Sequence, residues 1–214
     1  MEIGEAIKYP TTDDSWIKKV IIGGILGIIP IVNLVVFGYY LKVIKENIEG
    51  KTGMPDWEDW GSLFIKGIVM VVIYLIYMII PLIILGATVG GSIANVINSN
   101  DPNAIGDFGG AFAGILVSGI LILIISLMIP MALSIYAKED SFGAAFRIGE
   151  ILSRIKSVIG GYILAYIVIV VLGMILGMIG LIPILGWIMI IFGNFYIITV
   201  GAHMYGKLYT ESSA

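Results

Sequence analysis

The residue types on which most enzymes and metal sites depend are scarce in this sequence. Its 214 residues include one histidine and no cysteine, which excludes a histidine-cluster metal site, a thiolate metal site and a cysteine–histidine dyad. Neither a phosphate-binding loop nor a nucleophile elbow is present. The sequence therefore predicts a protein that is not an enzyme and carries no cofactor.

Three polar side chains within the long uncharged runs are candidates for a function in the membrane. His203, near the end of the last run, could relay protons, but a lone histidine there is more typical of an interfacial or hydrogen-bonded residue. Asn33 and Asn194 could line a cavity or coordinate a ligand through their side-chain carbonyls. The simpler interpretation of both is an interhelical hydrogen bond or a cap beside broken backbone.

A short acidic cluster consists of Asp56, Glu58 and Asp59. Carboxylates bind hard divalent cations, which makes a metal site one hypothesis. Acidic residues also favour the start of a helix, where the helix dipole is positive. The second explanation is simpler, and it requires no metal.

Membrane-spanning helices are the elements that must position these residues. Hydrophobic residues make up 59% of the chain and charged residues 13%, against about 25% charged in a soluble domain. A crossing needs roughly 20 uncharged residues, because a helix rises about 1.5 Å per residue and the hydrocarbon core is about 30 Å thick. The predicted fold is an all-α, polytopic membrane helix bundle in a single domain, 1–214. Its four full spans are predicted at 67–97, 108–137, 159–179 and 184–205.

A further uncharged stretch, 20–41, has a proline near its midpoint. Pro30 would divide it into two half-length helices that form a re-entrant hairpin, while the full length also fits a single fifth span. Basic residues gather in the connections 42–66 and 138–156, which the positive-inside bias places in the cytoplasm together with the C-terminus. The hairpin is favoured because it adds the N-terminal lysines to the same side. The expected location is the cell membrane.

Two segments in these connections, 55–64 and 140–156, have the pattern of amphipathic helices that lie on a membrane surface. Aromatic side chains anchor such interfacial helices at the headgroup level. In the second segment, Glu150 and Arg154 have the spacing of an ion pair on the polar face. The predicted anchors are Trp57, Trp60 and Phe64 in the first segment and Phe142 and Phe146 in the second.

Isoleucine–proline pairs recur along the apolar stretches and predict breaks in the helices. Segment 58–67 also resembles 139–149, because both contain Gly-x-x-Phe-x-x-Gly after a Glu-Asp pair. A diverged duplication of about 16–97 and 108–206 would explain both patterns, and chance is the alternative in a chain so rich in isoleucine. The four predicted break positions are Pro30, Pro81, Pro130 and Pro183.

Several short motifs resemble those of a known family. They are Tyr9-Pro10, Asp14, Trp16, the hexapeptide 28–33, Gly38-Tyr39 and Pro55-Asp56-Trp57-Glu58-Asp59-Trp60-Gly61. Together they resemble the signature of an archaeal membrane protein family, common in methanogens and catalogued as domain of unknown function 4013, and 141–146 and 181–187 are similar to its second half. The resemblance covers nearly the whole chain. It implies a multi-pass membrane protein of unestablished activity, with no catalytic residues to carry over.

Two classes of function remain. The first is a structural or accessory membrane protein, which would pack against the lipid bilayer and against other membrane proteins or copies of itself. The alternative is a small permease or channel for a neutral or apolar solute, with a path near Pro30 and Pro183; ion coupling is not expected because no span holds a deep charge. The first class is favoured because no span carries a polar stripe. The net charge of -3 gives no reason to expect a nucleic-acid partner.

Overall fold

The computed structural model describes residues 2–98 and 109–213, which are helical apart from short connections. No β-strand occurs in these two ranges, in agreement with the all-α prediction. In chain order the helices are α1 (Ile3–Lys8), the 3-10 helix η1 (Tyr9–Thr12), α2 (Trp16–Ile28), α3 (Asn33–Ile48), α4 (Trp60–Asn98), α5 (Gly109–Glu139), the 3-10 helix η3 (Phe142–Phe146), α6 (Ile148–Ser157), α7 (Ile159–Ile179) and α8 (Leu185–Glu211).

Four helices, α4, α5, α7 and α8, are long and apolar enough to cross a membrane. They overlap the four predicted spans, but α4 begins at Trp60 instead of Gly67 and α8 continues to Glu211 instead of ending at 205. Their outward faces are dominated by large apolar side chains, such as Ile83 and Leu123. Lipid tails match such faces, whereas water would make their exposure costly.

Two compact units divide the chain. The hairpin unit is Val72–Ile129, and the main unit is the remaining chain on either side of it. The main unit therefore contains α1 to α3, the start of α4, the end of α5, and α6 to α8.

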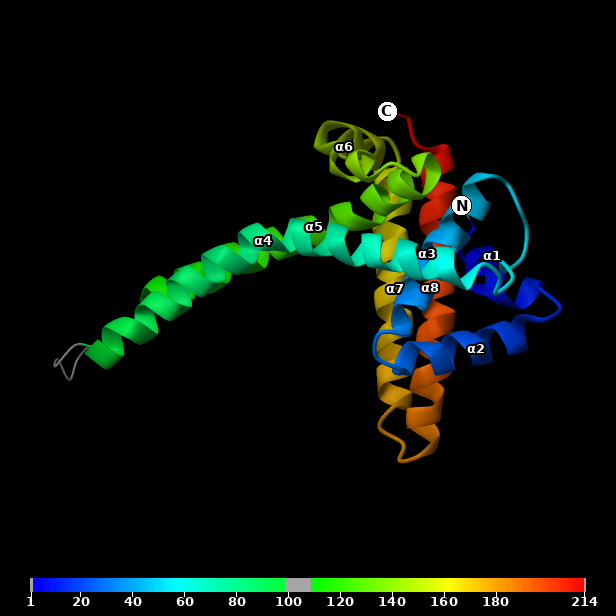
Figure 1. The fold of residues 1–214 in the computed structure, drawn as a ribbon, viewed down its shortest axis with the longest axis horizontal. Coiled ribbons are helices and arrows are strands. Elements are labelled where there is room, and N and C mark those ends of the chain that lie inside the picture. The colour runs from blue at the N-terminus through cyan, green and yellow to red at the C-terminus, as the bar shows by residue number, and fades with distance from the viewer. Residues whose placement is uncertain (1, 99–108, 214) are drawn as a thin grey trace. The chain divides into compact units, whose positions relative to one another are not determined.

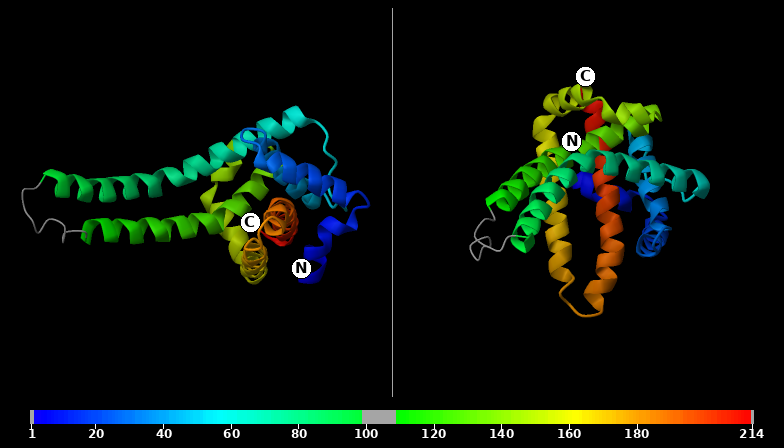
Figure 2. Two further views of the ribbon diagram at one scale, coloured as in Figure 1. Left: turned by 90° about the horizontal axis from the view of Figure 1, so that it is seen from below. Right: turned by 60° about the vertical axis from the view of Figure 1, so that its left-hand side comes forward.

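The central helix of the main unit is α8, against which α2, α3 and α7 pack. Figures 1 and 2 show α7 and α8 side by side along most of their length. Close approach of α2 depends on Gly23 and Gly24, because a Cβ there would lie 2.2 Å from the Phe195 ring or 2.5 Å from the Phe192 ring. The two rings therefore occupy the space where α2 lacks side chains, and Phe195 is buried as a result.

The crossing of α3 with the start of α4 is a direct backbone contact. A Cβ added to Gly38 would lie 1.8 Å from the carbonyl oxygen of Leu63, and a Cβ added to Gly67 would lie 1.8 Å from that of Leu34. Neither carbonyl can move without disturbing its own helix. Only glycine allows this crossing. Membrane helices that approach closely generally have small residues at the contact.

The hairpin unit consists of the two antiparallel stretches of α4 and α5, seen side by side in green in both panels of Figure 2. The two helices contact each other through small residues. Gly114 faces the Thr88 side chain, and a Cβ added to Gly110 would lie 3.6 Å from the Ser92 hydroxyl. The Thr88 hydroxyl donates to the carbonyl of Ile84 at 2.8 Å. The described residues of the hairpin unit include no charged side chain.

The breaks predicted at Pro81 and Pro130 are wrong, because both prolines lie inside continuous helices, α4 and α5. Membrane helices tolerate proline where neighbouring groups satisfy the freed backbone. Beside Pro130, the Met131 amide donates to the Tyr162 hydroxyl of α7 at 3.2 Å, and the Ser134 hydroxyl donates to the Pro130 carbonyl at 2.8 Å. Side chains therefore compensate for the irregular backbone at this proline.

By contrast, Pro30 and Pro183 lie in turns, between α2 and α3 and between α7 and α8. The residue after each proline is an isoleucine with positive φ, 71° at Ile31 and 64° at Ile184. A β-branched residue rarely adopts this left-handed conformation. These two turns are therefore held by the packing of the helices that flank them.

The surface helices differ from their prediction. Segment 55–59 is not helical, so the first predicted helix is merged into α4 from Trp60 onward. Segment 140–156 forms η3 and then α6, separated at Arg147, rather than one helix. The predicted ion pair on α6 is confirmed, since Arg154 Nε lies 2.9 Å from Glu150 Oε1.

The proposed duplication stays a prediction. Its two matched motifs share a local feature, because the aspartate of each Glu-Asp pair has a left-handed backbone, with φ of 52° at Asp59 and 53° at Asp140. Aspartate tolerates this conformation better than most residues.

Candidate functional site

The loop that joins α3 to α4, residues 49–59, is fixed by side chains from outside it. Four consecutive carbonyl oxygens of this α3–α4 loop each accept a hydrogen bond from a different side chain. A backbone segment held in this way is ordered, although it is neither helix nor strand. The donor and acceptor residues are Tyr9 and Gly53 at 2.6 Å, Lys19 and Met54 at 2.7 Å, Tyr39 and Pro55 at 2.7 Å, and Lys42 and Asp56 at 2.8 Å.

Lys19 is the centre of this arrangement and is almost fully buried. Its ammonium group lies 2.8 Å from Asp13 Oδ2 and 2.9 Å from Asp56 Oδ1. Burial alone would raise the pKa of Asp13, but hydrogen bonds from Lys19 and Ser15 outweigh it, so the pKa of this carboxyl is lower than usual. The lysine charge is thus compensated by two carboxylates, as a buried charge requires.

Trp57 lies in the α3–α4 loop and not on the predicted surface helix. Its ring stacks on Tyr39 with centroids 4.0 Å apart, and its Nε1 donates to the Lys19 carbonyl at 3.1 Å. The Trp57 ring also contacts Phe195 of α8. Trp57 therefore ties the loop to α2, α3 and α8 rather than pointing freely outward.

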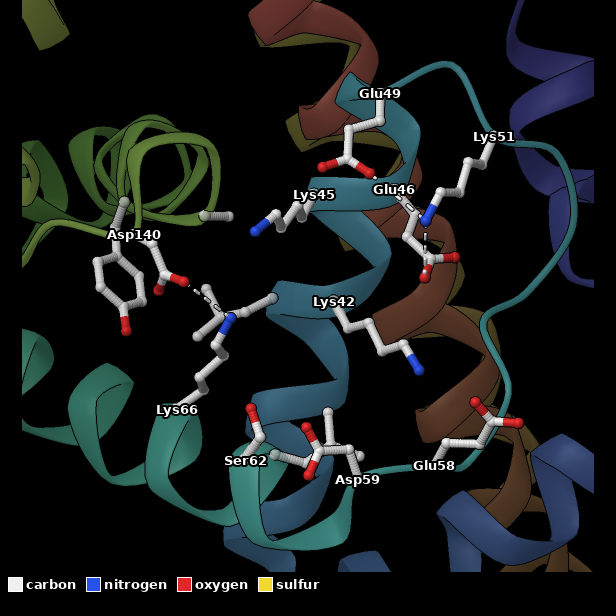
Figure 3. Close-up of a pocket in the computed structure, with 14 residues that line it drawn as sticks. Lys42, Lys45, Glu46, Glu49, Lys51, Glu58, Asp59, Ser62, Lys66 and Asp140 are labelled. Carbon is white, nitrogen blue, oxygen red and sulfur yellow. Dashed lines mark hydrogen bonds and ion pairs between the residues drawn. The ribbon is translucent and has the colours of Figure 1, made fainter.

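A charged pocket of about 260 Å³ lies beside this loop and is shown in Figure 3. It is bounded by α3, by the start of α4 and by the end of α5. Two of its lysines are paired: Lys66 lies 3.3 Å from Asp140, and Lys51 lies between Glu46 and Glu49. Lys45, Glu58 and Asp59 also line the pocket, and none of the three has a side-chain partner in the part of the chain that is described. The pocket thus offers unpaired charges of both signs.

A second polar cluster joins Tyr9, Asn47 and His203. The His203 ring stacks on Tyr9 with centroids 4.1 Å apart, and its Nδ1 is hydrogen-bonded to Asn47 Oδ1. Asn47 Nδ2 donates to the Tyr9 hydroxyl at 3.2 Å and to the Val43 carbonyl at 2.8 Å. Burial raises the pKa of Tyr9 to about 12, more than its hydrogen bond with Asn47 lowers it. Tyr9 is thus a neutral donor, which suits its bond to the loop.

Of the three predicted intramembrane polar residues, only His203 belongs to a buried polar network. Asn33 is the first residue of α3 and is half-buried, and Asn194 is exposed on α8. Neither side chain makes a hydrogen bond within the described ranges. The structure therefore does not bring these three residues together.

The predicted anchors also separate. Trp60 is exposed at the start of α4 and Phe64 is half-buried one turn further on. Phe142 and Phe146 contact each other edge-to-face, with centroids 5.2 Å apart, within η3. Because Trp57 is half-buried, this leaves Trp60 and Phe142 as the exposed aromatic residues of the predicted set.

Sequence reasoning missed the roles of Lys19 and Asn47. Lys19 stands next to Lys18 just before an apolar run, where lysines usually flank a helix and face solvent. Asn47 lies among charged residues on α3 and shows no periodic signal. The motif that contains Tyr9 was the available hint, because it stands far from every predicted span yet belongs to the family resemblance.

In the described part of the chain, these observations define an all-helical protein with four helices able to span a membrane, an ordered polar loop and an adjoining charged pocket. The chain belongs to a family described as a protein of unknown function, DUF4013, whose model matches residues 22–185. No curated protein and no solved structure matches the chain.

Proposed function

We propose that this chain is a multi-pass protein of the cell membrane with a structural or accessory role, without enzymatic activity, that holds a partner protein at the charged pocket beside the α3–α4 loop. The observation that carries the proposal is the loop itself, with four successive carbonyls bound by side chains. Such fixation keeps a surface in one conformation, which lowers the entropic cost of binding. The unpaired charges of Lys45, Glu58 and Asp59 supply contacts of both signs for a partner.

The proposed topology has the first apolar stretch, 20–41, as a re-entrant hairpin. Lys19 and Lys42 stand at its two ends, and both contact Asp56, Lys19 at the carboxylate and Lys42 at the backbone carbonyl. A single span would separate its two ends by about the thickness of the hydrocarbon core, roughly 30 Å. Contacts from both ends to the same residue support the hairpin.

The two basic connections are proposed to lie together in the cytoplasm. The Lys66–Asp140 ion pair joins 42–66 to 138–156 within the main unit, which supports their location on one side. The positive-inside bias then assigns that side to the cytoplasm. α6 is proposed as an interfacial helix, because its apolar residues Ile148 and Leu152 are exposed.

A permease receives less support. The charged pocket is lined by connections and helix ends rather than by residues from the middle of a span. Asn33 and Asn194, the polar residues that a solute path would use, lie at a helix start and on an exposed face. Zero flux of small neutral solutes into vesicles that contain the purified protein would eliminate this alternative.

The topology can be tested by cysteine labelling, since the natural chain has no cysteine. Single cysteines would replace Thr12 and Asn100, and intact cells would be treated with a membrane-impermeant thiol reagent. We expect labelling at Asn100 and none at Thr12 until the cells are opened. Labelling of both positions in intact cells would contradict the hairpin.

The partner site can be tested by charge reversal. In the variant Glu58→Lys/Asp59→Lys, a partner cross-linked to the wild-type protein in native membranes should be lost. The matched control Glu2→Lys/Glu5→Lys makes the same change in charge on the N-terminal segment, outside the charged pocket. Equal cross-linking of the same partner to all three proteins would contradict the proposed site.

A further inference from the structure

A separate cavity of about 570 Å³ lies in the main unit, between the N-terminal helices, the turn after α3 and the end of α8. Pockets for small ligands commonly have volumes of about 300 to 1,000 Å³. Its lining includes the three members of the buried polar cluster, Tyr9, Asn47 and His203. The cavity is therefore large enough for a ligand, and hydrogen-bonded polar side chains line part of it.

The hydrogen bonds of Asn47 determine which nitrogen of His203 carries the proton. Asn47 Nδ2 donates to the carbonyl of Val43 and to the Tyr9 hydroxyl, so its Oδ1 is the atom that faces His203. An amide oxygen can only accept, and Nδ1 of His203 must therefore be the donor. In the neutral ring, Nε2 is left as an acceptor with a free lone pair.

This Nε2 atom keeps some exposure. His203 is only 7% exposed, and Nε2 has no hydrogen-bond partner in residues 2–98 and 109–213. The one fully enclosed side-chain atom without a partner in those residues is the Ser118 hydroxyl. Nε2 is thus not fully enclosed, and His203 lines the cavity. A nearly buried acceptor of this kind is normally satisfied by a donor such as a hydroxyl or an N–H group.

Unpaired cations lie on the same lining. Lys8 and Lys207 form no ion pair with the described part of the chain, although Glu5 lines the cavity too. Lys51 differs, because Glu46 and Glu49 hold it. Two ammonium groups are therefore available to a negatively charged ligand.

The turn after α3 contributes further donors. Gly50 and Gly53 both have left-handed backbones, with φ of 79° and 80°, a conformation that glycine adopts without strain. Within the described ranges, the amides of Thr52 and Gly53 make no hydrogen bond. Successive backbone amides of this kind can bind an anion, and the nearest carboxylate oxygen, Asp13 Oδ2, lies 3.2 Å from a Cβ added to Gly53.

We propose that this cavity binds a phosphorylated polyol. The phosphate would interact with Lys8, Lys207 and the turn amides, and a hydroxyl of the polyol would donate to Nε2 of His203. Phosphate suits the site because its several oxygens can accept from ammonium and amide groups at once. The same chemistry occurs in a glycerol phosphate lipid headgroup and in a soluble polyol phosphate. The inference stands on the cavity alone and does not depend on a protein partner at the charged pocket.

Two measurements on the full chain purified in detergent distinguish a soluble ligand from a lipid headgroup. Titration calorimetry with glycerol phosphate tests a soluble ligand, and native mass spectrometry after incubation with phosphatidylglycerol or phosphatidylcholine tests a lipid. Binding in the first measurement identifies a soluble phosphate ester. Retention of phosphatidylglycerol over phosphatidylcholine identifies a lipid headgroup. Absence of binding in both measurements overturns the proposal.

The cations are tested by the variant Lys8→Gln/Lys207→Gln. Loss of two charge-assisted contacts should weaken binding at least about tenfold. The matched control Lys18→Gln/Lys156→Gln removes two exposed lysines that do not line the cavity, and its affinity should equal that of the wild type. Equal weakening in both variants would show a general charge effect and overturn the site.

The role of His203 is tested by comparing glycerol phosphate with inorganic phosphate, which has no polyol hydroxyl. The wild type should bind glycerol phosphate more tightly, and His203→Phe, which keeps a ring to stack on Tyr9, should bind the two equally. Tryptophan fluorescence checks that the variant is folded. If folded His203→Phe still prefers glycerol phosphate, the polyol hydroxyl does not donate to His203. If the wild type shows no such preference, the same conclusion follows.

Discussion

In the hairpin unit, two helices meet through small side chains, whereas in the main unit helices meet through backbone contacts and buried hydrogen bonds. The Gly114 contact is with the side chain of Thr88, which can rotate. The Gly38 and Gly67 contacts are with carbonyl oxygens of helices, which cannot. The main unit also holds a buried lysine with two carboxylates, while the described part of the hairpin unit holds no charge.

The difference concerns how strongly each region determines a single structure. Backbone crossings and buried charge networks tolerate few alternatives, because any change leaves a clash or an unpaired group. A contact between a glycine and a side chain that can rotate, as at Gly114 and Thr88, allows some local repacking. The ordered loop and both polar pockets lie in the main unit, where the restrictive contacts are found.

The largest effect is expected for Gly67→Ala in the main unit. The added Cβ would lie 1.8 Å from the Leu34 carbonyl, and overpacking of this kind should lower the free energy of unfolding by about 3 kcal/mol. Gly61→Ala is the matched control on the same helix, because a Cβ there meets nothing within 4 Å. The thermal unfolding midpoint in detergent measures both, and equal midpoints would contradict the backbone crossing.

A somewhat smaller effect is expected for Lys19→Met, which leaves Asp13, Asp56 and the Met54 carbonyl without their partner. We expect a loss of about 2 kcal/mol, less than for a fully buried pair because Asp56 is largely exposed. Lys18→Met, at the exposed neighbouring position, should leave stability unchanged. All four tryptophans lie in the main unit, so denaturant unfolding followed by tryptophan fluorescence reports on this region. Equal free energies of unfolding for the two variants would show that the Lys19 network contributes little to stability.

The hairpin unit should respond more weakly to the equivalent glycine change. In Gly114→Ala the Thr88 side chain can rotate away, at the cost of its hydrogen bond to Ile84, and a loss of about 1 kcal/mol follows. Gly119→Ala on the same helix meets nothing within 4 Å and serves as the control. Thermal midpoints again provide the measurement. A loss as large as that of Gly67→Ala would remove the distinction between the two units.

The smallest effect is expected from acid. The pKa of Asp13 is lower in the folded state than its usual value, so its contribution to stability is present above the unfolded pKa of about 3.9 and is lost as pH falls through the lower folded value. Because Asp13 keeps some contact with solvent, the contribution should be under about 1 kcal/mol. Tryptophan fluorescence of the wild type should show this loss below about pH 4. Lys19→Met should show a smaller acid-dependent loss, because only the Ser15 hydrogen bonds still lower the pKa of Asp13, and an identical acid response of both proteins would contradict the assignment to Asp13.

Much of the span prediction could be made from the sequence, because crossing length depends only on the rise of a helix and the thickness of a bilayer. The limits of α7 match the prediction, and the turns at Pro30 and Pro183 were identified. The breaks at Pro81 and Pro130 were wrong, because whether a proline interrupts a helix depends on whether another helix supplies the missing hydrogen bonds, as Tyr162 does beside Pro130. His203 was identified as a candidate from its type, whereas its partners Tyr9 and Asn47 were not, since they are far from it in the sequence.

What the sequence by itself determined is the class of protein: long uncharged runs form helices suited to lipid, and their lengths set the number of possible spans. Only the tertiary structure decided that Lys19 is buried, that Trp57 packs inward, and that the turn after α3 shares a cavity with the end of α8. The physical reason is one of range. Helix formation and lipid exposure depend on neighbouring residues, whereas a buried charge or a hydrogen-bonded loop depends on groups that only the packing of distant helices brings together.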